Sequence, residues 1–440
     1  MKIAVIGGGI SGLSCAYYLK RAGHDAVVFD PSPGGSIGSV TLEGCILETG
    51  PESWLAMKPW AEQLIRELGL ADELMGSNDA GRRTYVLRRG QFVTLPEGLQ
   101  MVVPTKIWPV AESRLFSWRT KFRMATEIFR SPQATPDRSV SEFVADHFGD
   151  EAVAYLAEPL LAGVYGGSPD DLSAASVLPK FVEYEQRYGS VVVGTMRDKR
   201  KPSGQSIFKT MRHGMGTLID ALISRVDLVR AAVESIVAVV REDAAGWLVF
   251  AEGQWQPFDH VVLACGANRA SPLIAATDAR LSELLAAIRY TSSSIWTFGY
   301  RRSDVPHPLD AFGFLVPKPE RRSIMACTWL GTKWQGRVPA DKAVFRCFST
   351  DPDVSREAVL ADLNRLMGMT AEPIFELNHR WPDSMPQYSV GHTARVAEID
   401  ARMAAIPGLS LIGNAFKGIG IPDCVRSAQK AAERIGPAAI

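Results

Sequence analysis

Short apolar runs alternate with glycine turns at the start of the chain. Residues 2–6 are mostly apolar and predict a short buried strand, and the glycine-rich residues 7–12 follow immediately. Apolar positions in 13–20 recur at helical spacing, so a helix is expected there. A second apolar run, 26–29, predicts a second strand that ends on Asp30. The pattern predicts a strand, a glycine turn, a helix and a second strand in one unit.

The glycine spacing of this first turn is typical of dinucleotide binding. Gly7 permits a tight turn, Gly9 allows a pyrophosphate to approach the backbone, and Gly12 allows the helix to pack on its strand. Asp30 lies at the position where an acid is expected to accept hydrogen bonds from an adenosine ribose. A glycine turn without a ligand is the alternative, and the unit suits FAD and NAD equally. The predicted contacts are Gly7, Gly8, Gly9, Ile10, Ser11, Gly12 and Asp30.

Two further glycine turns follow, where an NAD-binding domain would normally continue with a helix. They are residues 34–38 (GGSIG) and 47–53 (LETGPES). Backbone of this kind suits a longer, extended cofactor, which favours FAD over NAD. The additional cofactor contacts expected here are Gly35, Ser36, Gly50, Pro51, Glu52 and Ser53.

The end of the chain repeats the order of strand, glycine loop and helix over residues 409–435. Pro422 and Asp423 suit the first turn of a helix, because proline lacks an amide hydrogen and the acid lies near the positive dipole end. A helix start facing the pyrimidine edge of a flavin would stabilise negative charge on the reduced ring. The alternative is an ordinary connection between a strand and a helix. The expected cofactor contacts are Asn414, Ile419, Gly420 and Ile421.

Composition narrows the class of protein. With 440 residues the chain exceeds what one hydrophobic core usually supports, so two packed domains are expected. Lys+Arg and Asp+Glu are equal at 48 each, so no overall charge favours nucleic acid as a partner. The six cysteines form no C-x-x-C pair and the seven histidines show no ligand spacing, so no metal site is predicted. The opening leaves no room for a signal peptide, and no uncharged apolar run reaches about 18 residues, so a cytoplasmic protein is expected.

Residues 100–200 predict helices in which aromatic and basic side chains are mixed. This composition suits a membrane surface, because basic groups bind anionic headgroups while apolar side chains enter the interface. The alternative is a set of helices packed on the domain with a solvated basic face. The apolar members are Leu115, Phe116, Trp118, Phe122, Met124, Ile128 and Phe129, and the basic members are Arg114, Arg119, Lys121, Arg123 and Arg130.

Longer motifs are distributed over nearly the whole chain. They are YVLRRGQFVTLP at 85–96, EPLLAGVYGG at 158–167 with DLS at 171–173, GFLVP at 313–317, RW at 380–381, PQY at 386–388, GH at 391–392 and GNAFKGIGIPDC at 413–424. Together with the dinucleotide unit, they resemble the protoporphyrinogen and coproporphyrinogen oxidase family of the FAD-dependent amine oxidase superfamily. The chain departs from that family at Ser36, where a bulky or basic residue is usual, and at Asp30, where a glutamate is common.

The resemblance implies an α/β fold. Its parts would be an FAD-binding Rossmann-like domain of the glutathione-reductase and amine-oxidase type, an antiparallel-sheet substrate domain and a helical insertion. It adds two cofactor contacts, Val233 on the adenine side and Trp381. The expected divisions are 1–80, 206–275 and 396–440 for FAD binding, 81–100 and 276–395 for the substrate domain, and 101–205 for the helical, membrane-surface insertion.

The resemblance also implies a reaction, the six-electron oxidation of protoporphyrinogen IX to protoporphyrin IX in haem biosynthesis, with FAD and O2. Oxidation of coproporphyrinogen III to coproporphyrin III is the first alternative. Two more distant possibilities are another FAD-dependent amine or carotenoid oxidoreductase and a non-catalytic binding protein with a flavoprotein fold. Because the flavin performs the hydride chemistry, no catalytic side chain is named.

The expected partners are a porphyrinogen and O2, without nucleic acid. Peripheral contact with the cytoplasmic face of the membrane and a homodimer are both left open. The propionates of the substrate need cations, since guanidinium groups match carboxylate geometry. The expected substrate contacts are Arg82, Arg83 and His392.

Overall fold

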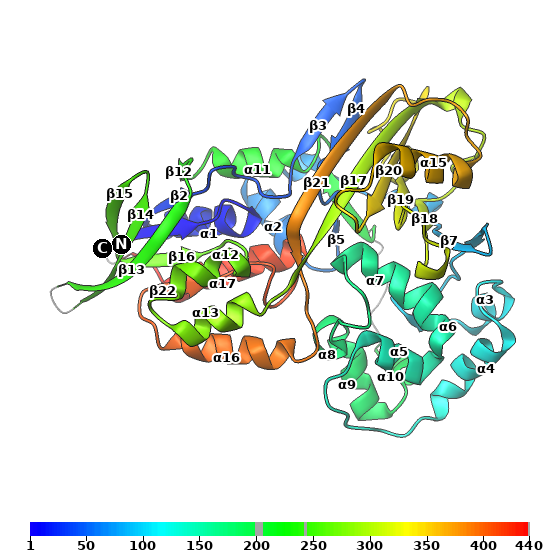
Figure 1. Cartoon of the computed structure of the whole chain (residues 1–440), viewed down its shortest axis with the longest axis horizontal. Helices are drawn as coiled ribbons and strands as arrows, with labels where there is room; N and C mark the ends of the chain where they lie inside the picture. The colour runs from blue at the N-terminus through cyan, green and yellow to red at the C-terminus, as the bar shows by residue number, and fades with distance from the viewer. Residues whose placement is uncertain (199–205, 242–243, 439–440) are drawn as a thin grey trace.

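The chain forms three parts, shown in Figure 1 as a computed structural model. The structure describes residues 1–198, 206–241 and 244–438. A parallel sheet with its helices lies on the left of the view, a large sheet lies at the upper right, and a group of helices lies at the lower right. The predicted α/β fold, with its Rossmann-like domain, second sheet and helical insertion, is confirmed. Among the described residues, we find no helix of the length and apolar character that crossing a bilayer requires.

Five parallel strands form the sheet on the left, in the order β12-β2-β1-β16-β22. Alternate side chains of β1 enter two different cores: Ile3 and Val5 pack on one face, and Ala4 and Ile6 on the other. Such strands, buried on both faces, require apolar residues at every position. The strands are β1 (Lys2–Ile6), β2 (Asp25–Phe29), β12 (Asp227–Val229), β16 (His260–Leu263) and β22 (Leu409–Leu411).

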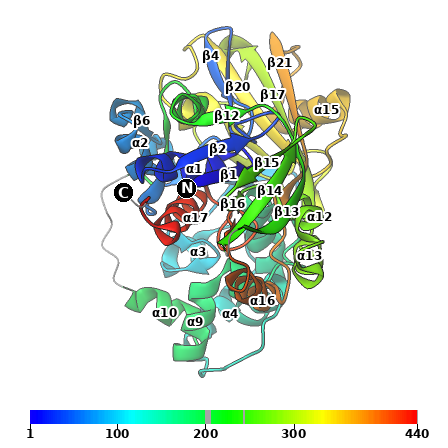
Figure 2. The same ribbon diagram turned by 90° about the vertical axis from the view of Figure 1, so that its left-hand side faces the viewer.

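Helices cover one face of this sheet and a mixed layer covers the other, as Figure 2 shows for α17 and the β13–β15 layer. The first face carries α1 (Ile10–Arg21), α2 (Trp60–Glu67), α11 (Gly216–Ile223) and α17 (Ile421–Ile435). The second carries β13 (Val233–Arg241), β14 (Ala244–Ala251), β15 (Gln254–Phe258), α12 (Ala267–Ile274), α13 (Ala279–Ala286) and α16 (His392–Ala404). Small sheets beside them contain β3 (Ser39–Leu42) with β4 (Cys45–Glu48), and β5 (Trp54–Leu55) with β11 (Phe208–Met211) and β6 (Leu74–Gly76).

The large sheet has seven strands in the order β21-β17-β20-β19-β18-β7-β8. All neighbours are antiparallel except β18 and β7, which pair in parallel. The strands are β7 (Tyr85–Arg88), β8 (Gln91–Thr94), β17 (Tyr290–Arg301), β18 (Gly313–Leu315), β19 (Ala326–Trp329), β20 (Lys342–Ser349) and β21 (Phe375–Pro386), with α14 (Leu330–Lys333) and α15 (Arg356–Met367) beside them. The long β17–β21 pair runs from this sheet toward the parallel sheet (Figure 1).

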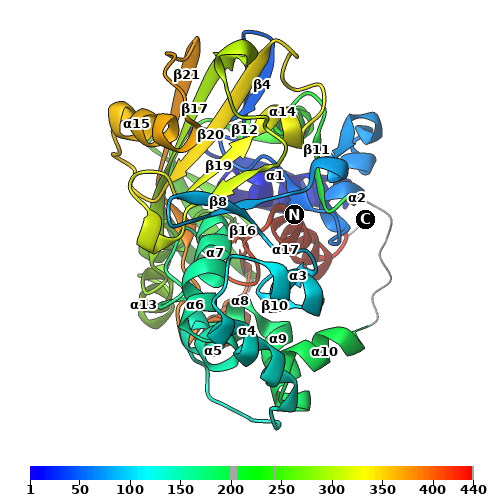
Figure 3. The same ribbon diagram turned by 90° about the vertical axis from the view of Figure 1, so that its right-hand side faces the viewer.

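The helical part has its own apolar core, and α3 and α4 lie at its outer side (Figures 1 and 3). It contains β9 (Leu99–Gln100), β10 (Val103–Pro104), α3 (Ile107–Glu112), α4 (Trp118–Thr126), α5 (Val140–Phe148), α6 (Asp150–Ala152), α7 (Glu158–Tyr165), α8 (Ala174–Val177), α9 (Pro179–Tyr188) and α10 (Val191–Arg197). Leu115, Phe116 and Met124 are buried in this core. These three side chains therefore follow the alternative expectation, in which the helices pack on the domain and their apolar residues do not face a membrane.

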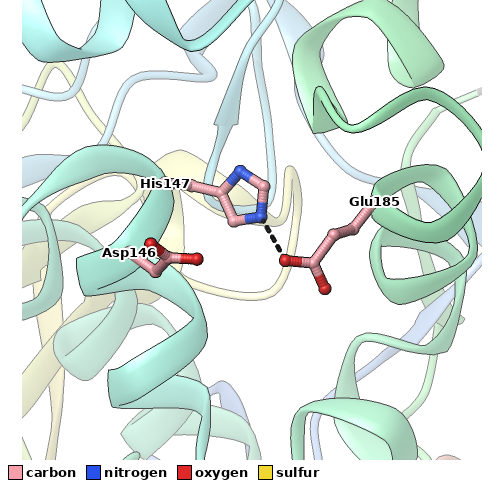
Figure 4. Close-up of side chains that lie close together, drawn as sticks. All are labelled: Asp146, His147 and Glu185. Carbon is pink, nitrogen blue, oxygen red and sulfur yellow. Dashed lines mark hydrogen bonds and ion pairs between the residues drawn. The ribbon is translucent and has the colours of Figure 1, made fainter. Parts of the chain in front are cut away.

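A buried histidine joins α5 and α9 inside the helical part (Figure 4). The Nδ1 of His147 lies 2.8 Å from Glu127 Oε1, and its Nε2 lies 3.2 Å from Glu185 Oε1. Ionised carboxylates only accept hydrogen bonds, so both ring nitrogens carry hydrogen and the ring is an imidazolium. Burial alone would lower the pKa of His147, but the hydrogen bonds from the two carboxylates outweigh it and raise the pKa.

Arginines complete the charge balance of this cluster. Arg138 donates to Glu185 at 2.5 Å and lies 3.3 Å from Asp146, and Arg130 binds Asp146 at 2.6 Å. Asp146, His147 and Glu185 are close enough to resemble a metal site. The protein's own cations already occupy these carboxylates, and we therefore interpret the cluster as an ion network that joins helices.

The His147 network should make the stability of the helical part depend on pH. A raised folded-state pKa means that the stabilisation is complete below the unfolded pKa of about 6.5 and is lost as pH rises through the folded-state value. The free energy of unfolding, measured with denaturant from pH 6 to pH 9, should therefore fall more steeply in the native chain than in a His147→Gln chain. Equal slopes in the two chains would contradict the imidazolium assignment.

Candidate functional site

The residues predicted to bind a dinucleotide gather at the carboxyl edge of the parallel sheet. Gly7–Gly9 follow β1, Asp30 follows β2, Val233 lies four residues beyond β12, and the loop 413–420 follows β22. Because all five strands run in parallel, these loops emerge at one edge, where open α/β sheets bind their ligands. The Gly7 amide donates to Phe29 O at 2.9 Å, and the Asp30 amide donates to Val229 O at 3.1 Å, so neighbouring loops are tied together.

Three of the four glycines in the first loop, Gly7, Gly9 and Gly12, have different surroundings. A Cβ on Gly7, which has φ +113°, would lie 2.8 Å from the backbone of Ala264 and Cys265, and one on Gly12 would overlap Gly7 O. A Cβ on Gly9 would meet nothing within 4 Å. Gly7 and Gly12 are therefore required by packing, whereas the open position at Gly9, at the start of α1, matches the space that a pyrophosphate needs.

Asp30 presents a carboxylate whose two oxygens are fixed by backbone amides. Its Oδ2 accepts from Gly8 N–H at 2.6 Å and its Oδ1 accepts from Ser32 N–H at 2.7 Å. Each oxygen retains a second lone pair, so the group can also accept from hydroxyls. Its contact with a ribose stays a prediction. Of the neighbouring predicted contacts, Ile10 and Ser11 are buried, and the Ser11 hydroxyl faces the Cys424 thiol of α17.

The second and third glycine turns continue away from the first as a connected row. Gly35 lies beside Gly9, since a Cβ on Gly35 would be 3.4 Å from the Cα of Gly9. Gly50 is so close to Ser36 that a Cβ there would overlap Ser36 O. At the end of the row, the indole Nε1 of Trp381 on β21 donates to Thr49 O at 2.9 Å. The structure thus brings together three segments that the sequence placed in separate motifs.

Glu52 has buried cationic partners that its prediction as a cofactor contact did not anticipate. Its carboxylate forms ion pairs with Lys333 and, at 2.6 Å, with Arg346 of β20. Burial alone would raise the pKa of Glu52, but these two charges outweigh it and lower the pKa to about 2. Arg346 also donates to Gly50 O at 2.8 Å. The carboxylate therefore fixes the turn that contains Gly50, Pro51 and Ser53 against the large sheet.

A second buried pair reinforces this connection and was missed by sequence reasoning. Arg337 donates to Glu48 at 2.7 Å and to Thr210 at 2.9 Å, and Glu48 also accepts from Met215 N–H at 3.0 Å. Arg346 and Arg337 are at most 1% exposed. A signal was present for Arg346, because it stands in the middle of the apolar run AVFRCF of β20, and a charge there requires a partner.

The start of α17 faces the same edge of the sheet. Gly420 is the extended residue before the helix, and Ile421 begins it. Asp423 in the first turn pairs with Lys58 at 2.6 Å and lies against Gly418 and Gly420. Asn414 and Ile419 lie in the loop before this helix start. The structure therefore brings Asn414, Ile419, Gly420 and Ile421 to the edge where the N-terminal loop ends.

The three predicted substrate contacts lie in different surroundings. Arg82 is exposed and lies just before β7. Arg83 is 58% exposed and lies 3.2 Å from Asp310, so its charge is already neutralised by a carboxylate. His392 is 2% exposed, and its Nε2 donates to Phe416 O at 3.1 Å. Burial lowers the pKa of His392, so the ring is neutral and does not supply a cation for a propionate. Its hydrogen bond to Phe416 in the loop 413–420 instead indicates a structural role.

These residues fit FAD. The open position at Gly9, the start of α1 and the acid at Asp30 would hold the pyrophosphate and the adenosine of FAD. The start of α17 would hold the flavin at the other end of this extended dinucleotide. The row from Gly35 to Trp381 lies along the interface between the parallel sheet and β21. Bound there, FAD would supply a hydride acceptor. Fold and site thus define a flavin-dependent oxidoreductase.

Comparison with known proteins agrees with this class. The family described as flavin containing amine oxidoreductase matches residues 10–436. The chain belongs to this family, and FAD is its cofactor. It is 32% identical to coproporphyrinogen III oxidase from Bacillus subtilis, over 96% of this chain and 95% of the relative. It is 25% identical to protoporphyrinogen oxidase 2 from Arabidopsis thaliana, over 99% of this chain and 93% of that protein.

A solved structure is similar over the whole length. A protein from Exiguobacterium sp. 255-15, provisionally described as a protoporphyrinogen oxidase, superposes with a TM-score of 0.85 at 30% identity. The superposition covers 99% of this chain and 98% of that one. All three parts of the fold, including the helical part, therefore have counterparts in that protein.

A Gly9→Val chain should fold normally and lose FAD. The valine side chain would occupy the open position without meeting protein atoms at its Cβ, so the affinity for FAD should fall at least about a hundredfold. The measurement is the ratio of flavin to protein absorbance after purification, with circular dichroism as the check on folding. Gly163→Val is the matched control, because Gly163 on α7 also has nothing within 4 Å. Full FAD content in Gly9→Val would contradict the assignment of the phosphate loop.

Proposed function

We propose that the chain oxidises a porphyrinogen to the aromatic porphyrin in haem biosynthesis. The observation that carries the proposal is the similarity to porphyrinogen oxidases over almost the full chain, combined with the open cofactor position at Gly9. The names of these relatives include both candidate substrates. The more similar curated relative is a coproporphyrinogen III oxidase, at 32% identity against 25% for the protoporphyrinogen oxidase. We therefore place coproporphyrinogen III ahead of protoporphyrinogen IX among the substrates to be tested, which reverses the order expected from the basic and aromatic helical segment of the sequence.

In this reaction, the main task of the protein is to position the substrate at the flavin. Conversion of a porphyrinogen removes six hydrogens, in three two-electron rounds, and we propose O2 as the final acceptor. The chain must hold one bridge carbon of the substrate at the flavin and exclude water. Tyr165 of α7 lies near the start of α17, and its ring centroid lies 6.0 Å from that of Tyr388. Burial is the main cause that raises the pKa of Tyr165 to about 12, and the negative charge of Asp423, in the first turn of α17, adds to the shift.

A buried glutamine fixes this contact between the helical part and the long strands. Gln387 donates to Tyr165 O at 2.7 Å and to Thr291 Oγ1 at 2.9 Å. Gln387 is 4% exposed, and a Cβ on Gly167 would overlap its side chain. We infer that α7 forms the wall opposite the cofactor and that the substrate lies between this wall and the start of α17.

Porphyrin fluorescence should appear when the purified yellow protein meets a porphyrinogen in air. Coproporphyrinogen III and protoporphyrinogen IX are assayed side by side, and we expect a rate with coproporphyrinogen at least about tenfold higher. The Gly9→Val protein is the control for non-enzymatic oxidation. A higher rate with protoporphyrinogen would reverse the substrate assignment. No enzyme-dependent fluorescence from either compound would contradict the proposed function.

We further propose that the outer face of α3 and α4 contacts the membrane surface. Four aromatic side chains of α3, α4 and the short turn of helix after α4 are each at least 72% exposed, which is unusual for such residues. They are Trp108, Trp118, Phe122 and Phe129. Arg114, Arg119 and Arg123 are exposed in the same segment, and Lys121 lies 4.5 Å from the Trp118 ring centroid. Exposed aromatic rings beside cations match an anionic bilayer surface, where the rings enter the interface and the cations bind headgroups.

Vesicle sedimentation tests this contact. The native chain should sediment with vesicles of phosphatidylcholine and phosphatidylglycerol and much less with phosphatidylcholine alone. A Trp118→Ser, Phe122→Ser double variant should bind about tenfold more weakly, because it removes two large apolar groups from the interface. Trp255→Ser is the control, since Trp255 is 48% exposed on β15, far from α4. Unchanged binding of the double variant would contradict the proposal.

A further inference from the structure

Residues 387–392, from the end of β21 to the first residue of α16, lie where the three parts of the molecule meet. Tyr388 and His392 in this segment are each 2% exposed. Their rings stack with centroids 4.2 Å apart and planes inclined by 10°. The Tyr388 ring also packs in the core of the helical part, with its centroid 6.0 Å from that of Tyr165.

The two rings hold the cofactor loop 413–420 through polar contacts. The Tyr388 hydroxyl donates to Asn414 O at 2.6 Å and accepts from Gly418 N–H at 2.9 Å. Between these contacts, the His392 Nε2 donates to Phe416 O at 3.1 Å. Alternate residues of the loop, 414, 416 and 418, are therefore fixed just before α17 begins at Ile421.

The backbone of the same segment is anchored to the helical part. Tyr388 O accepts from Ser173 N–H at 2.7 Å, and Gly391 N–H donates to Asp137 at 2.9 Å. Ser173 in turn donates its hydroxyl to Asp137 at 2.8 Å. Neither ring brings charge, since burial lowers the pKa of His392 and raises that of Tyr388. Any effect of the pair on the cofactor must therefore act through position.

We propose that Tyr388 and His392 are positioning residues that hold the start of α17 against the flavin and thereby set its reduction potential. The proposal rests on the role in flavin binding inferred above for Gly420 and Ile421. A helix start stabilises the anionic reduced ring only at close range, because the effect falls off within the first turn. A loop released from Tyr388 would allow this helix start to shift, and the reduced flavin would lose more stabilisation than the oxidised flavin.

Removal of one hydroxyl tests the proposal. Tyr388→Phe keeps the stacked ring and removes both contacts to the loop. We expect reduced FAD to bind about tenfold more weakly relative to oxidised FAD, which for a two-electron couple is a potential about 30 mV more negative. The potential is measured by reductive titration against a reference dye. In the apoprotein, amide exchange of residues 414–418 should accelerate, because Gly418 N–H loses its acceptor.

Matched variants separate positioning from general stability. Tyr300→Phe is the control: Tyr300 is fully buried, and its hydroxyl has no partner within the described part of the chain. It should leave the potential and the amide exchange unchanged. His392→Phe should shift the potential in the same direction as Tyr388→Phe, and His392→Gln, which retains a side-chain donor, should restore most of it. A native potential in both Tyr388→Phe and His392→Phe would overturn the proposal. No step of this test uses a porphyrinogen, so its failure is distinct from failure of the proposed function.

Discussion

Buried ion pairs between the cofactor segment and the large sheet are the constraint on which the site depends. Glu48 pairs with Arg337, and Glu52 pairs with Lys333 and Arg346. Loss of one partner from such a pair typically costs about 3–5 kcal/mol, because the other charge stays buried without compensation. The turn between Glu48 and Glu52, which contains Gly50, therefore has one stable position. This turn thereby holds the row of residues from Gly35 to Trp381 in one position between the two sheets.

The same arrangement explains how a flavoprotein can direct a reaction in which the flavin performs the hydride chemistry. Its contribution is the relative placement of the first glycine loop, the start of α17 and the helix α7. Each element belongs to a different part of the molecule, and the contacts between them are specific: Trp381 to Thr49, Gln387 to Tyr165, and Tyr388 to the loop 413–420. Precise positioning of this kind is what hydride transfer to a cofactor requires of a protein.

Prediction from the sequence succeeded where a local pattern carries the information. Gly7 and Gly12 lie in positions that no side chain could share, and Gly9 lies beside open space, as the spacing indicated. It was less successful for side chains whose partners lie far away in the chain. His392 was expected at the substrate and is buried below the cofactor loop, and the partners of Glu52 come from residues 281 and 294 positions further on. Tyr388 belongs to the PQY motif, and the local pattern gave no indication of its contacts with the loop 413–420.

By itself, the sequence determined the parallel-sheet unit, the class of cofactor and the family, because strand hydrophobicity, glycine spacing and helix starts are properties of short segments. The tertiary structure alone decided which aromatic residues of the helical part are buried and which, such as Trp118 and Phe122, face outward. It also decided that Glu52 and His392 support the site from buried positions. The physical reason is that burial and the pairing of charges depend on long-range contacts, which a local pattern does not contain.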